Sequence, residues 1–237
     1  MRLLAFETAT EACSVSLWLD GEVHERFEIA PRRHAELSLP WAGQLLAEAG
    51  VAKSQLDAIA VGRGPGAFTG VRLAVALAQG IALALDRPVV PVSTLAALAL
   101  QARALQPLDS EPARVLAAID ARMGEVYAGR FELRGDDVVA LSQEAVGAPD
   151  SLGLEGTGWL GVGTGFAAAQ GALRDRLGAQ LVDCDATALP HAADIARLAA
   201  IAFSRGECVA PERVEPAYLR NNVALTIAGQ QALRDAR

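Results

Sequence analysis

One feature of this sequence constrains its fold more than any other: the same order of segments occurs twice. In each half, three segments with the pattern of strands precede an alternation of helices and strands. In the first half these segments are residues 2–6, 12–19, 22–29, 34–49, 57–61, 71–85, 89–92 and 93–105. In the second half they are residues 114–119, 125–133, 138–142, 149–154, 159–162, 167–177, 180–183 and 192–204. A repeated order predicts two α/β lobes, each with a mixed sheet and flanking helices.

A polar, turn-rich stretch at residues 106–112 separates the halves. We place the boundary there, which gives lobes of residues 1–107 and 108–237. The duplicated βββαβα plan resembles that of the actin, DnaK-chaperone and sugar-kinase (ASKHA) group. In that group, the turns after the first strand of each lobe face one another across a cleft that holds nucleotide phosphates. Glu7 and Asp120 end the first strands here, so the resemblance puts both carboxylates at such a cleft.

A glycine-rich loop, GRGPGAFTGVR at residues 62–72, leads into the second helix. Four glycines and a proline predict a sharp turn in which the backbone comes close to another group. One interpretation is a phosphate bound at the helix N-terminus. The spacing does not match a P-loop, because Gly70 is followed by Val71 and Arg72 rather than by lysine. The favoured interpretation is that the glycines permit tight packing of the helix on the sheet.

The helix after this loop is apolar nearly all round. Between residues 71 and 85 only Arg72 and Gln79 carry polar side chains, whereas a surface helix normally has one apolar stripe. If Leu73, Leu77 and Ala84 cover the lobe's own sheet, a second apolar side is left for another protein. The predicted partner interface consists of Phe68, Arg72, Val75, Ala76, Gln79 and Gly80. The small residues of this set would let a second helix approach closely.

Composition and charge disfavour several classes of protein. Apolar residues make up 52% of the 237 residues, but Gln79 interrupts the longest apolar run before it reaches the ~18 residues of a membrane span. Glu7 lies where a signal peptide needs its apolar core, so we expect a cytoplasmic protein without membrane contact. The net charge of −7 argues against tight binding of tRNA or DNA by the chain alone. Cys13, Cys184 and Cys208 are far apart, which predicts reduced thiols.

Four blocks of sequence resemble the bacterial TsaB family, also called YeaZ. They are FETATEACSV at residues 6–15, GRGPGAFTGVR at 62–72, IDARMGEVY at 119–127 and EPAYLRNNVA at 215–224. The resemblance implies a non-catalytic scaffold subunit, without a cofactor, in the formation of threonylcarbamoyladenosine in ANN-decoding tRNAs. It also implies that the tail, residues 206–237, crosses back onto the first lobe.

The same resemblance implies a set of partners. The first is TsaD, the related enzyme that transfers the threonylcarbamoyl group, with which TsaB forms a heterodimer. The ATPase TsaE docks on that heterodimer. A TsaB chain alone forms a homodimer, and tRNA is bound only as part of the complex.

Residues suited to catalysis are few. The catalytic relative holds a metal through a His-x-x-x-His pair, but the residue four after His34 is Ser38, so we expect no metal site. There is no Gly-x-Ser-x-Gly motif, and no cysteine has a histidine in a sequence context that suggests a catalytic pair. The nucleotide cleft of the fold would comprise Glu7, Thr8, Asp120, Gly161, Gly163 and Gly165.

This cleft is interpreted as vestigial. The first turn offers Ala9 and Ala12 and no basic residue for phosphates, and Glu7 replaces the usual aspartate and narrows the space. We therefore expect weak or no ATP binding. Two classes of function stay open: a scaffold subunit without catalysis, and an ATP-dependent enzyme or glycoprotease-like hydrolase of the same fold. Nucleotide titration of the isolated chain would separate them.

Overall fold

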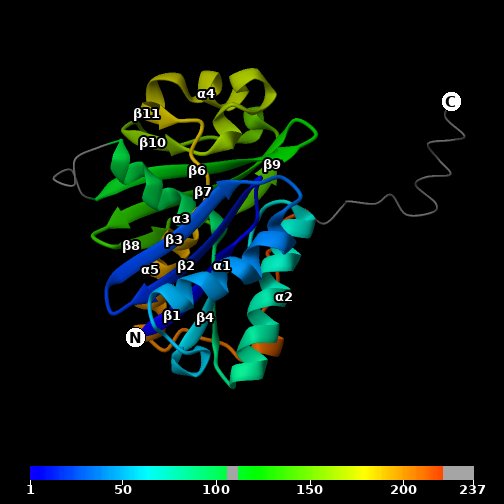
Figure 1. Ribbon diagram of the computed structural model, residues 1–237. Helices are drawn as coiled ribbons and strands as arrows, with labels where there is room; N and C mark the ends of the chain where they lie inside the picture. Colours follow the sequence, from blue (N-terminus) through cyan, green and yellow to red (C-terminus); the bar gives the residue numbers. More distant parts are fainter. Residues whose placement is uncertain (106–111, 221–237) are drawn as a thin grey trace, which may run out of the picture.

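Two mixed β-sheets organise the chain (Figure 1), which the computed structural model describes over residues 1–105 and 112–220. The first half forms β1 (Arg2–Glu7), β2 (Ala12–Leu19), β3 (Glu22–Ile29), β4 (Ala58–Gly62) and β5 (Val89–Val92). The second half forms β6 (Ala113–Arg122), β7 (Glu125–Arg134), β8 (Asp137–Ala140), β9 (Ala145–Gly147), β10 (Trp159–Val162) and β11 (Leu181–Asp185). The first sheet has the order β3-β2-β1-β4-β5, and the second has the matching order β8-β7-β6-β10-β11, with β9 paired to β7. The predicted α/β fold with two lobes and duplicated mixed sheets is confirmed.

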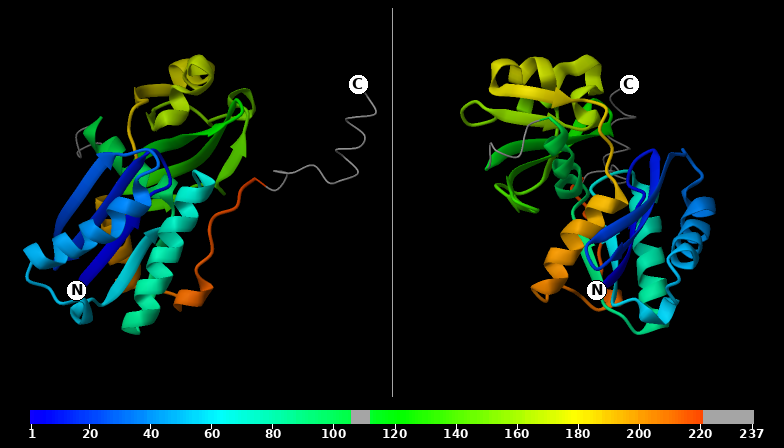
Figure 2. Two further views of the ribbon diagram at one scale, coloured as in Figure 1. Left: turned by 45° about the vertical axis from the view of Figure 1, so that its right-hand side comes forward. Right: turned by 60° about the vertical axis from the view of Figure 1, so that its left-hand side comes forward.

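Helices alternate with these sheets in layers. The α-helices are α1 (His34–Glu48), α2 (Phe68–Leu85), α3 (Thr94–Ala99), α4 (Ala172–Leu177) and α5 (Ala192–Ser204). Short 3-10 helices are η1 (Lys53–Gln55), η2 (Leu100–Ala104), η4 (Pro149–Ser151), η5 (Thr164–Phe166), η6 (Ala168–Gly171), η7 (Gly178–Gln180) and η8 (Pro211–Arg213). Helices α1 and α2 cover the outer face of the first sheet, α3 and α5 lie between the sheets, and α4 covers the far face of the second sheet (Figures 1 and 2).

Strand β1 shows how the sequence buries the first sheet on both faces. Its alternating side chains divide between two cores: Leu4 and Phe6 pack toward α1 and α2, while Leu3 and Ala5 face the layer between the sheets. Strand β4 pairs with it in parallel and is buried at all five positions. A short, continuous apolar run suits a parallel strand that is covered on both sides.

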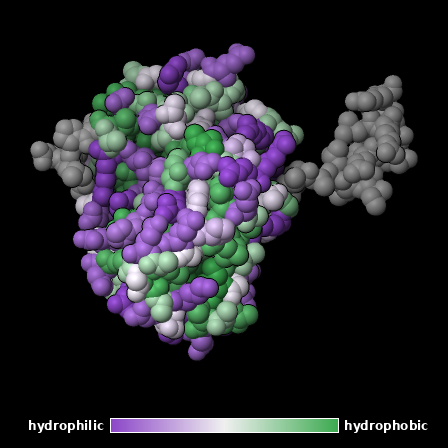
Figure 3. Space-filling model, in the orientation of Figure 1, coloured by the Kyte–Doolittle hydropathy of each residue, from purple (hydrophilic) through white to green (hydrophobic). Residues whose placement is uncertain are grey.

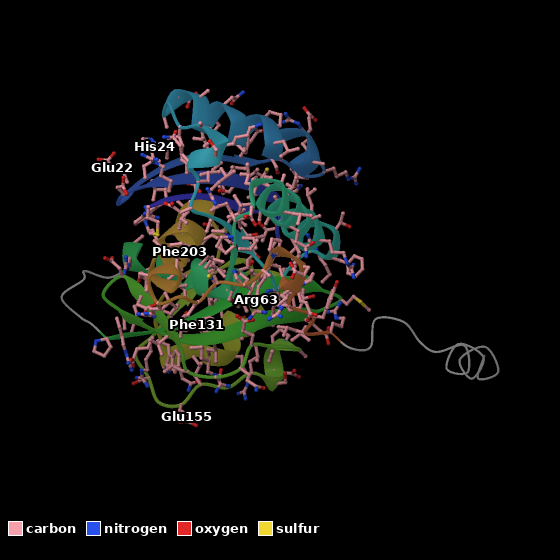
Figure 4. The ribbon with its side chains drawn as sticks, turned by 90° about the horizontal axis from the view of Figure 1, so that it is seen from below. Glu22, His24, Arg63, Phe131, Glu155 and Phe203 are labelled. Atoms are coloured by element: carbon pink, nitrogen blue, oxygen red, sulfur yellow. The ribbon has the colours of Figure 1, made fainter. Side chains whose placement is uncertain are left out.

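The last helix of each half packs against the sheet of the other half. Helix α3 follows β5 in the chain but contacts β6, β7 and β8, while α5 follows β11 and contacts all five strands of the first sheet. Phe131 of β7 and Phe203 of α5 both belong to the layer between the sheets (Figure 4). The two lobes therefore share one core, although residues 192–204 follow the predicted lobe boundary. That boundary itself, at residues 107 and 108, lies outside the described residues.

A cluster of polar side chains fixes the start of α5 on the first sheet. Glu25 of β3 accepts hydrogen bonds at Oε1 from the Ser14 hydroxyl (2.6 Å) and the Ala193 N–H (3.0 Å), and its Oε2 lies 3.0 Å from His191 Nδ1. The His191 ring stacks on Phe27, with 4.0 Å between ring centroids. The free N–H groups at the helix start thus find acceptors on a strand more than 160 residues earlier in the chain.

The second lobe departs from the predicted order of elements. The helix predicted at residues 149–154 is only the 3-10 turn η4, because glycines at positions 153, 156 and 158 leave too few helix-forming residues. Strand β9 lies where no element was predicted. The helix predicted at residues 167–177 becomes regular only at Ala172, because Ala169 and Gln170 have left-handed φ angles of 47° and 61°.

The chain after α5 returns to the first lobe. Val209 exchanges two backbone hydrogen bonds with Val89 of β5, and η8 then packs against α2. The left view of Figure 2 shows the residues after η8 running alongside α2. The remainder of the predicted tail, residues 221–237, lies outside the described residues.

Candidate functional site

The glycine-rich loop is interlocked with the loop between β1 and β2. A Cβ atom added to Gly70 would lie 1.9 Å from the Thr8 carbonyl oxygen, and one added to Gly66 would lie 2.4 Å from the Ala9 carbonyl oxygen. The Thr8 hydroxyl donates to the Gly70 carbonyl (2.7 Å), and the Ala67 N–H donates to the Ala9 carbonyl (2.7 Å). Gly66 and Gly70 are therefore required by a close approach to the backbone of the β1–β2 loop, rather than by the packing of the helix on the sheet that the favoured interpretation expected.

Glu7 lies buried beneath these two loops. Its carboxylate accepts hydrogen bonds from the Ala9 N–H (2.6 Å) and the Thr94 hydroxyl (2.7 Å), and the same hydroxyl accepts from the Gly64 N–H (3.2 Å). A Cβ atom on Gly62 would lie 2.0 Å from the Glu7 carboxylate, so no larger residue fits there without rearrangement. Removal from water raises the pKa of Glu7 to about 7, although its hydrogen bonds oppose the shift. Glu7 thus connects the two loops from below.

A cavity of about 660 Å³ opens between the lobes above these loops. Its walls come from the β1–β2 loop, the β3–α1 loop, the entrance of α2, the β6–β7 hairpin, the residues after β10, and residues 216–220. Its polar lining residues are Thr10, Glu11, Arg32, His34, Asp120, Arg122, Tyr127, Thr164, Tyr218 and Arg220. The volume lies within the range of small-molecule sites. The sequence analysis assigned no role to the arginines among these residues, although Arg122 and Arg220 lie within two of the blocks that carry the family resemblance.

Of the six residues predicted for the nucleotide cleft, Asp120 is the one that lines this cavity. Its carboxylate accepts from the Arg122 backbone N–H (2.7 Å) and from the Arg122 guanidinium (2.8 Å). Its own N–H donates to the Thr164 hydroxyl (3.2 Å). The carboxylate is therefore already paired with a cation of this chain.

The three predicted cleft glycines lie behind the cavity and pack the second lobe. A Cβ atom on Gly163 would lie 2.2 Å from the Ala118 carbonyl oxygen, and one on Gly165 would lie 2.6 Å from the Ala118 Cβ. A Cβ atom on Gly161 would lie 2.7 Å from the Phe166 ring. These glycines permit close contact between β10, η5 and β6, and the structure gives them no place in the cavity lining.

Helix α2 faces its own core with a different side from the one predicted. Val75 is only 5% exposed and belongs to the core over the first sheet, so the prediction that Val75 faces a partner is wrong. The predicted inner residue Ala84 is exposed instead. The buried positions are Val71, Ala74, Val75, Ala78 and Ala82. With apolar residues on nearly every side, the sequence left the inward face ambiguous.

The other predicted interface residues lie at the surface of α2 or are half-buried. Ala76 and Gly80 are exposed, and Phe68 is 64% exposed. The Arg72 guanidinium lies over the Phe68 ring, 3.2 Å from its centroid, and 5.1 Å from the centroid of Tyr218. Gln79 donates to the Val214 carbonyl (3.2 Å). Figure 3 shows hydrophobic side chains gathered along this helix.

The length and composition of α2 are also those of a membrane-crossing helix. Its 18 residues have a mean hydropathy of 1.7, and 28% of them are buried inside the molecule. The expectation that Gln79 would interrupt such a segment is therefore not met. One face of the helix nevertheless packs on β4 and β1 as part of the core, so composition alone does not make it a membrane span.

The histidine expected to lack a metal partner has structural contacts. His34 Nε2 lies 3.0 Å from the Thr10 carbonyl and 3.2 Å from the Ala12 carbonyl, and the Ser38 hydroxyl donates to the His34 carbonyl (2.7 Å). Within residues 1–105 and 112–220, no three or more His, Cys, Asp or Glu side chains are grouped to hold a metal ion.

Comparisons with known proteins agree with this architecture. A family model described as TsaD, tRNA N6-adenosine threonylcarbamoyltransferase, matches residues 22–236. The chain is 42% identical over 230 residues to tRNA threonylcarbamoyladenosine biosynthesis protein TsaB of Escherichia coli (strain K12), with 94% of this chain and 96% of that protein covered. It is 38% identical over 234 residues to the TsaB of Haemophilus influenzae, with 94% and 95% covered.

The structural comparison gives the same relationship. The structure of YeaZ from Pseudomonas aeruginosa has a TM-score of 0.83 and 46% sequence identity, and the match covers 92% of this chain and 99% of that one. Similarity therefore extends over nearly the whole length of both chains, and this protein belongs to the TsaB (YeaZ) family.

Proposed function

We propose that the chain is a non-catalytic subunit in the biosynthesis of threonylcarbamoyladenosine in tRNA, and that it pairs with TsaD through the exposed side of α2. The observation that carries the proposal is this exposed apolar side, which has Leu83 at 74% exposure and the small residues Ala76 and Gly80 between its ends. Apolar surface of this extent on one helix is typical of a surface that another protein covers.

The proposed interface follows from the observed faces of the helix. Phe68 and Arg72 lie at its entrance, and Ala76 and Gly80 follow at helical spacing, so that a second helix could approach closely along this line. Gln79 is engaged by the tail, so it contributes to the interface only at its edge. A second copy of this chain would use the same surface, so homodimer and heterodimer compete.

The side chains that could serve catalysis are held in structural roles, which supports the absence of catalysis. Burial raises the pKa of Cys13, and it raises the pKa of Cys184 to about 11, so both thiols are protonated near neutral pH and are poor nucleophiles. Glu7 is enclosed beneath two loops and the His34 ring is bound to backbone carbonyls. In this proposal TsaE docks on the heterodimer, tRNA binds only to the complex, and the protein works in the cytoplasm.

Substitution of the exposed residue Ala76 tests the proposed interface. Ala76→Glu places a charge on the proposed contact, where it would be buried without a partner, and should weaken association by several kcal/mol without unfolding the chain. Ala140→Glu is the matched control, since Ala140 is exposed on β8 at the edge of the second sheet. Sedimentation with and without TsaD measures both contacts. An Ala76→Glu protein that still forms the homodimer and captures TsaD with wild-type affinity would place the interface elsewhere.

A second candidate, an ATP-dependent enzyme of the same fold, is favoured by one observation: the cavity between the lobes contains a carboxylate, Asp120. Its pairing with Arg122 and the interlocked loops below it argue for a vestigial cleft. Nucleotide titration of the isolated chain decides between the two. ATP turnover that Asp120→Ala abolishes would establish the enzyme.

A further inference from the structure

One segment of the tail connects the entrance of α2 with the second lobe. We call residues 214–220 the strap. On the first lobe, the strap accepts a hydrogen bond from Gln79 at the Val214 carbonyl (3.2 Å), and its Ala217 N–H donates to the Arg63 carbonyl (2.8 Å). The Tyr218 ring then lies beside Arg72, whose guanidinium carbon is 5.1 Å from its centroid. Val214, at the start of the strap, is buried in the core over the first sheet.

The other end of the strap holds the β6–β7 hairpin. The Arg220 guanidinium donates to the Ala121 carbonyl (3.2 Å) and to the Glu125 carboxylate, and its Nη1 lies 3.8 Å from the Met123 sulfur. One arginine therefore contacts both strands of the hairpin and the residue at its tip. Charge-assisted contacts of this kind are stronger than hydrogen bonds between neutral groups.

The hairpin that Arg220 holds is strained. Three consecutive residues at its tip are left-handed: Arg122 at φ 63°, Met123 at φ 58° and Gly124 at φ 76°. Glycine adopts this conformation freely, but residues with a side chain do so at a cost. Met123 is also 88% exposed, so no packing around its side chain explains the conformation. Asp120 holds Arg122 from within the hairpin, and Arg220 adds contacts from the strap on both sides of the tip.

The strap and the hairpin are both walls of the cavity between the lobes. The strap contributes Pro216, Ala217, Tyr218, Leu219 and Arg220, and the hairpin contributes Ile119, Asp120, Ala121, Arg122 and Tyr127. Release of the strap would remove one wall of the cavity. It would also free the strained turn of the hairpin, which positions Arg122 and its partner Asp120 in a second wall.

We propose that the strap is a clamp between the lobes: it couples the entrance of α2 to the left-handed turn of the β6–β7 hairpin, and its release opens the cavity. The coupling depends on contacts at both ends, so loosening one end loosens the other. This proposal rests on contacts within the chain and does not require the proposed pairing with TsaD.

Hydrogen exchange of the full chain, followed by mass spectrometry, tests the clamp. Arg220→Ala removes the contacts on the second lobe, and Tyr218→Ala removes the ring beside Arg72 on the first lobe. With either variant we expect exchange at least about tenfold faster in peptides covering residues 121–127 and in those covering 214–220, where the Ala217 N–H reports the first-lobe end. Peptides covering residues 164–168, three of which also line the cavity, should exchange faster as well.

The matched control is Arg213→Ala. Arg213 is exposed in η8, just before the strap, and its side chain has no hydrogen bond or ion pair to another described residue, while its backbone N–H donates to the Ala210 carbonyl (2.9 Å). This variant should exchange like the wild type. Peptides of β1 and β4 serve as an internal standard, because faster exchange there would report unfolding. If Arg220→Ala unfolds the chain, Arg220→Lys provides the weaker perturbation.

Two results would overturn the proposal. The first is a hydrogen-exchange rate in residues 214–220 and 121–127 that stays at the wild-type value in both variants. This result would show that the strap is not a clamp. The second is faster exchange confined to the substituted end, which would show that the two ends are independent.

Discussion

At the scale of single residues, two glycines of the same helix have opposite roles. A Cβ atom on Gly70 would collide with the Thr8 carbonyl oxygen at 1.9 Å, whereas one on Gly80 would meet nothing within 4 Å. Gly70→Ala should therefore separate the interlocked loops and lower the free energy of unfolding by about 2–5 kcal/mol. Gly80→Ala should raise it by about 0.5–1 kcal/mol, because alanine is the better helix former.

Chemical denaturation of both variants measures this difference, at protein concentrations low enough to keep the chain monomeric. A Gly70→Ala protein as stable as Gly80→Ala would show that the two loops separate without cost.

Glu7 gives stability a dependence on pH. Burial raises its pKa from the ordinary 4.5 to about 7, so the folded state holds the proton more tightly than the unfolded state. The stabilisation is complete below pH ~4.5 and is lost as the pH rises through about 7. Since each pKa unit corresponds to about 1.4 kcal/mol, the loss is on the order of 3 kcal/mol.

Glu7→Gln should remove this dependence. The difference in unfolding free energy between Glu7→Gln and wild type should then increase in favour of the variant between pH 4.5 and 7.5. Glu11→Gln changes an exposed carboxyl in the same loop and serves as the control. Parallel stability curves for Glu7→Gln and wild type across this range would contradict the prediction.

At this scale the sequence predicted that the glycines allow a close approach, but not which group they approach or what each cleft residue touches. The number of glycines indicated close packing, and the structure identifies the packed group as the loop after β1. The position of Glu7 at the end of β1 was also correct, but its burial depends on a second loop that approaches from residue 62 onward. Such contacts between distant loops leave no local pattern in the sequence.

At the scale of elements, the attachment of α5 to β3 depends on two ionisable groups. Burial alone would raise the pKa of Glu25, but hydrogen bonds from His191, Ser14 and the Ala193 N–H outweigh it and lower that pKa below the usual 4.5. Burial alone would lower the pKa of His191, but Glu25 outweighs it and raises that pKa above the usual 6.5. The ion pair is therefore a net stabilising contact.

The sign of each shift defines a pH window. The contribution of Glu25 is present above pH ~4.5 and is lost as the pH falls through its lowered pKa. The contribution of His191 is present below pH ~6.5 and is lost as the pH rises through its raised pKa. Glu25→Gln should therefore cost the most stability between pH 4.5 and 6.5, by about 1–3 kcal/mol.

Thermal unfolding of Glu25→Gln and His191→Gln across pH 4 to 8 measures this window. Glu22→Gln, at the exposed start of the same strand, is the control. A cost of Glu25→Gln that is the same at pH 5.5 and pH 8 would show that His191 takes no part.

Helix α2 shows where patterns in single elements fail. Its end at Leu85 was predicted correctly, and its start was predicted within three residues, because the glycine loop precedes it. Its inward face was only partly predicted: Leu77 packs against the core as expected, but Ala84 is exposed although it is as apolar as the residues that the core contains. A hydrophobic pattern can select a face only when the other faces are polar.

At the scale of the whole molecule, the repeated order of segments predicted two lobes with mixed sheets, but not the order of the strands within each sheet. It did not predict that α3 and α5 pack on each other's sheets, because an apolar helix fits either sheet equally well by composition. Because each lobe is completed by a helix from the other half of the chain, this arrangement determines whether the two halves unfold together. The inward face of the first sheet packs against α5, which comes from the second half of the chain.

Unfolding should therefore occur as one transition, and neither half should fold alone. Without α5, the inward face of the first sheet would expose the apolar residues Leu3, Ala5, Ala58, Ala60, Val90 and Val92. A fragment of residues 1–107 should thus give no cooperative melting transition, and the same holds for residues 108–237, which lose α3.

Mixing the two fragments should restore the helix and strand content, because α3 and α5 can then each reach the opposite sheet. Circular dichroism on each fragment and on their mixture measures this, with the intact chain as the reference. A cooperative transition in residues 1–107 alone would show that α1, α2 and the five strands form a core without α5, and that the layer between the sheets is a contact between two independent lobes.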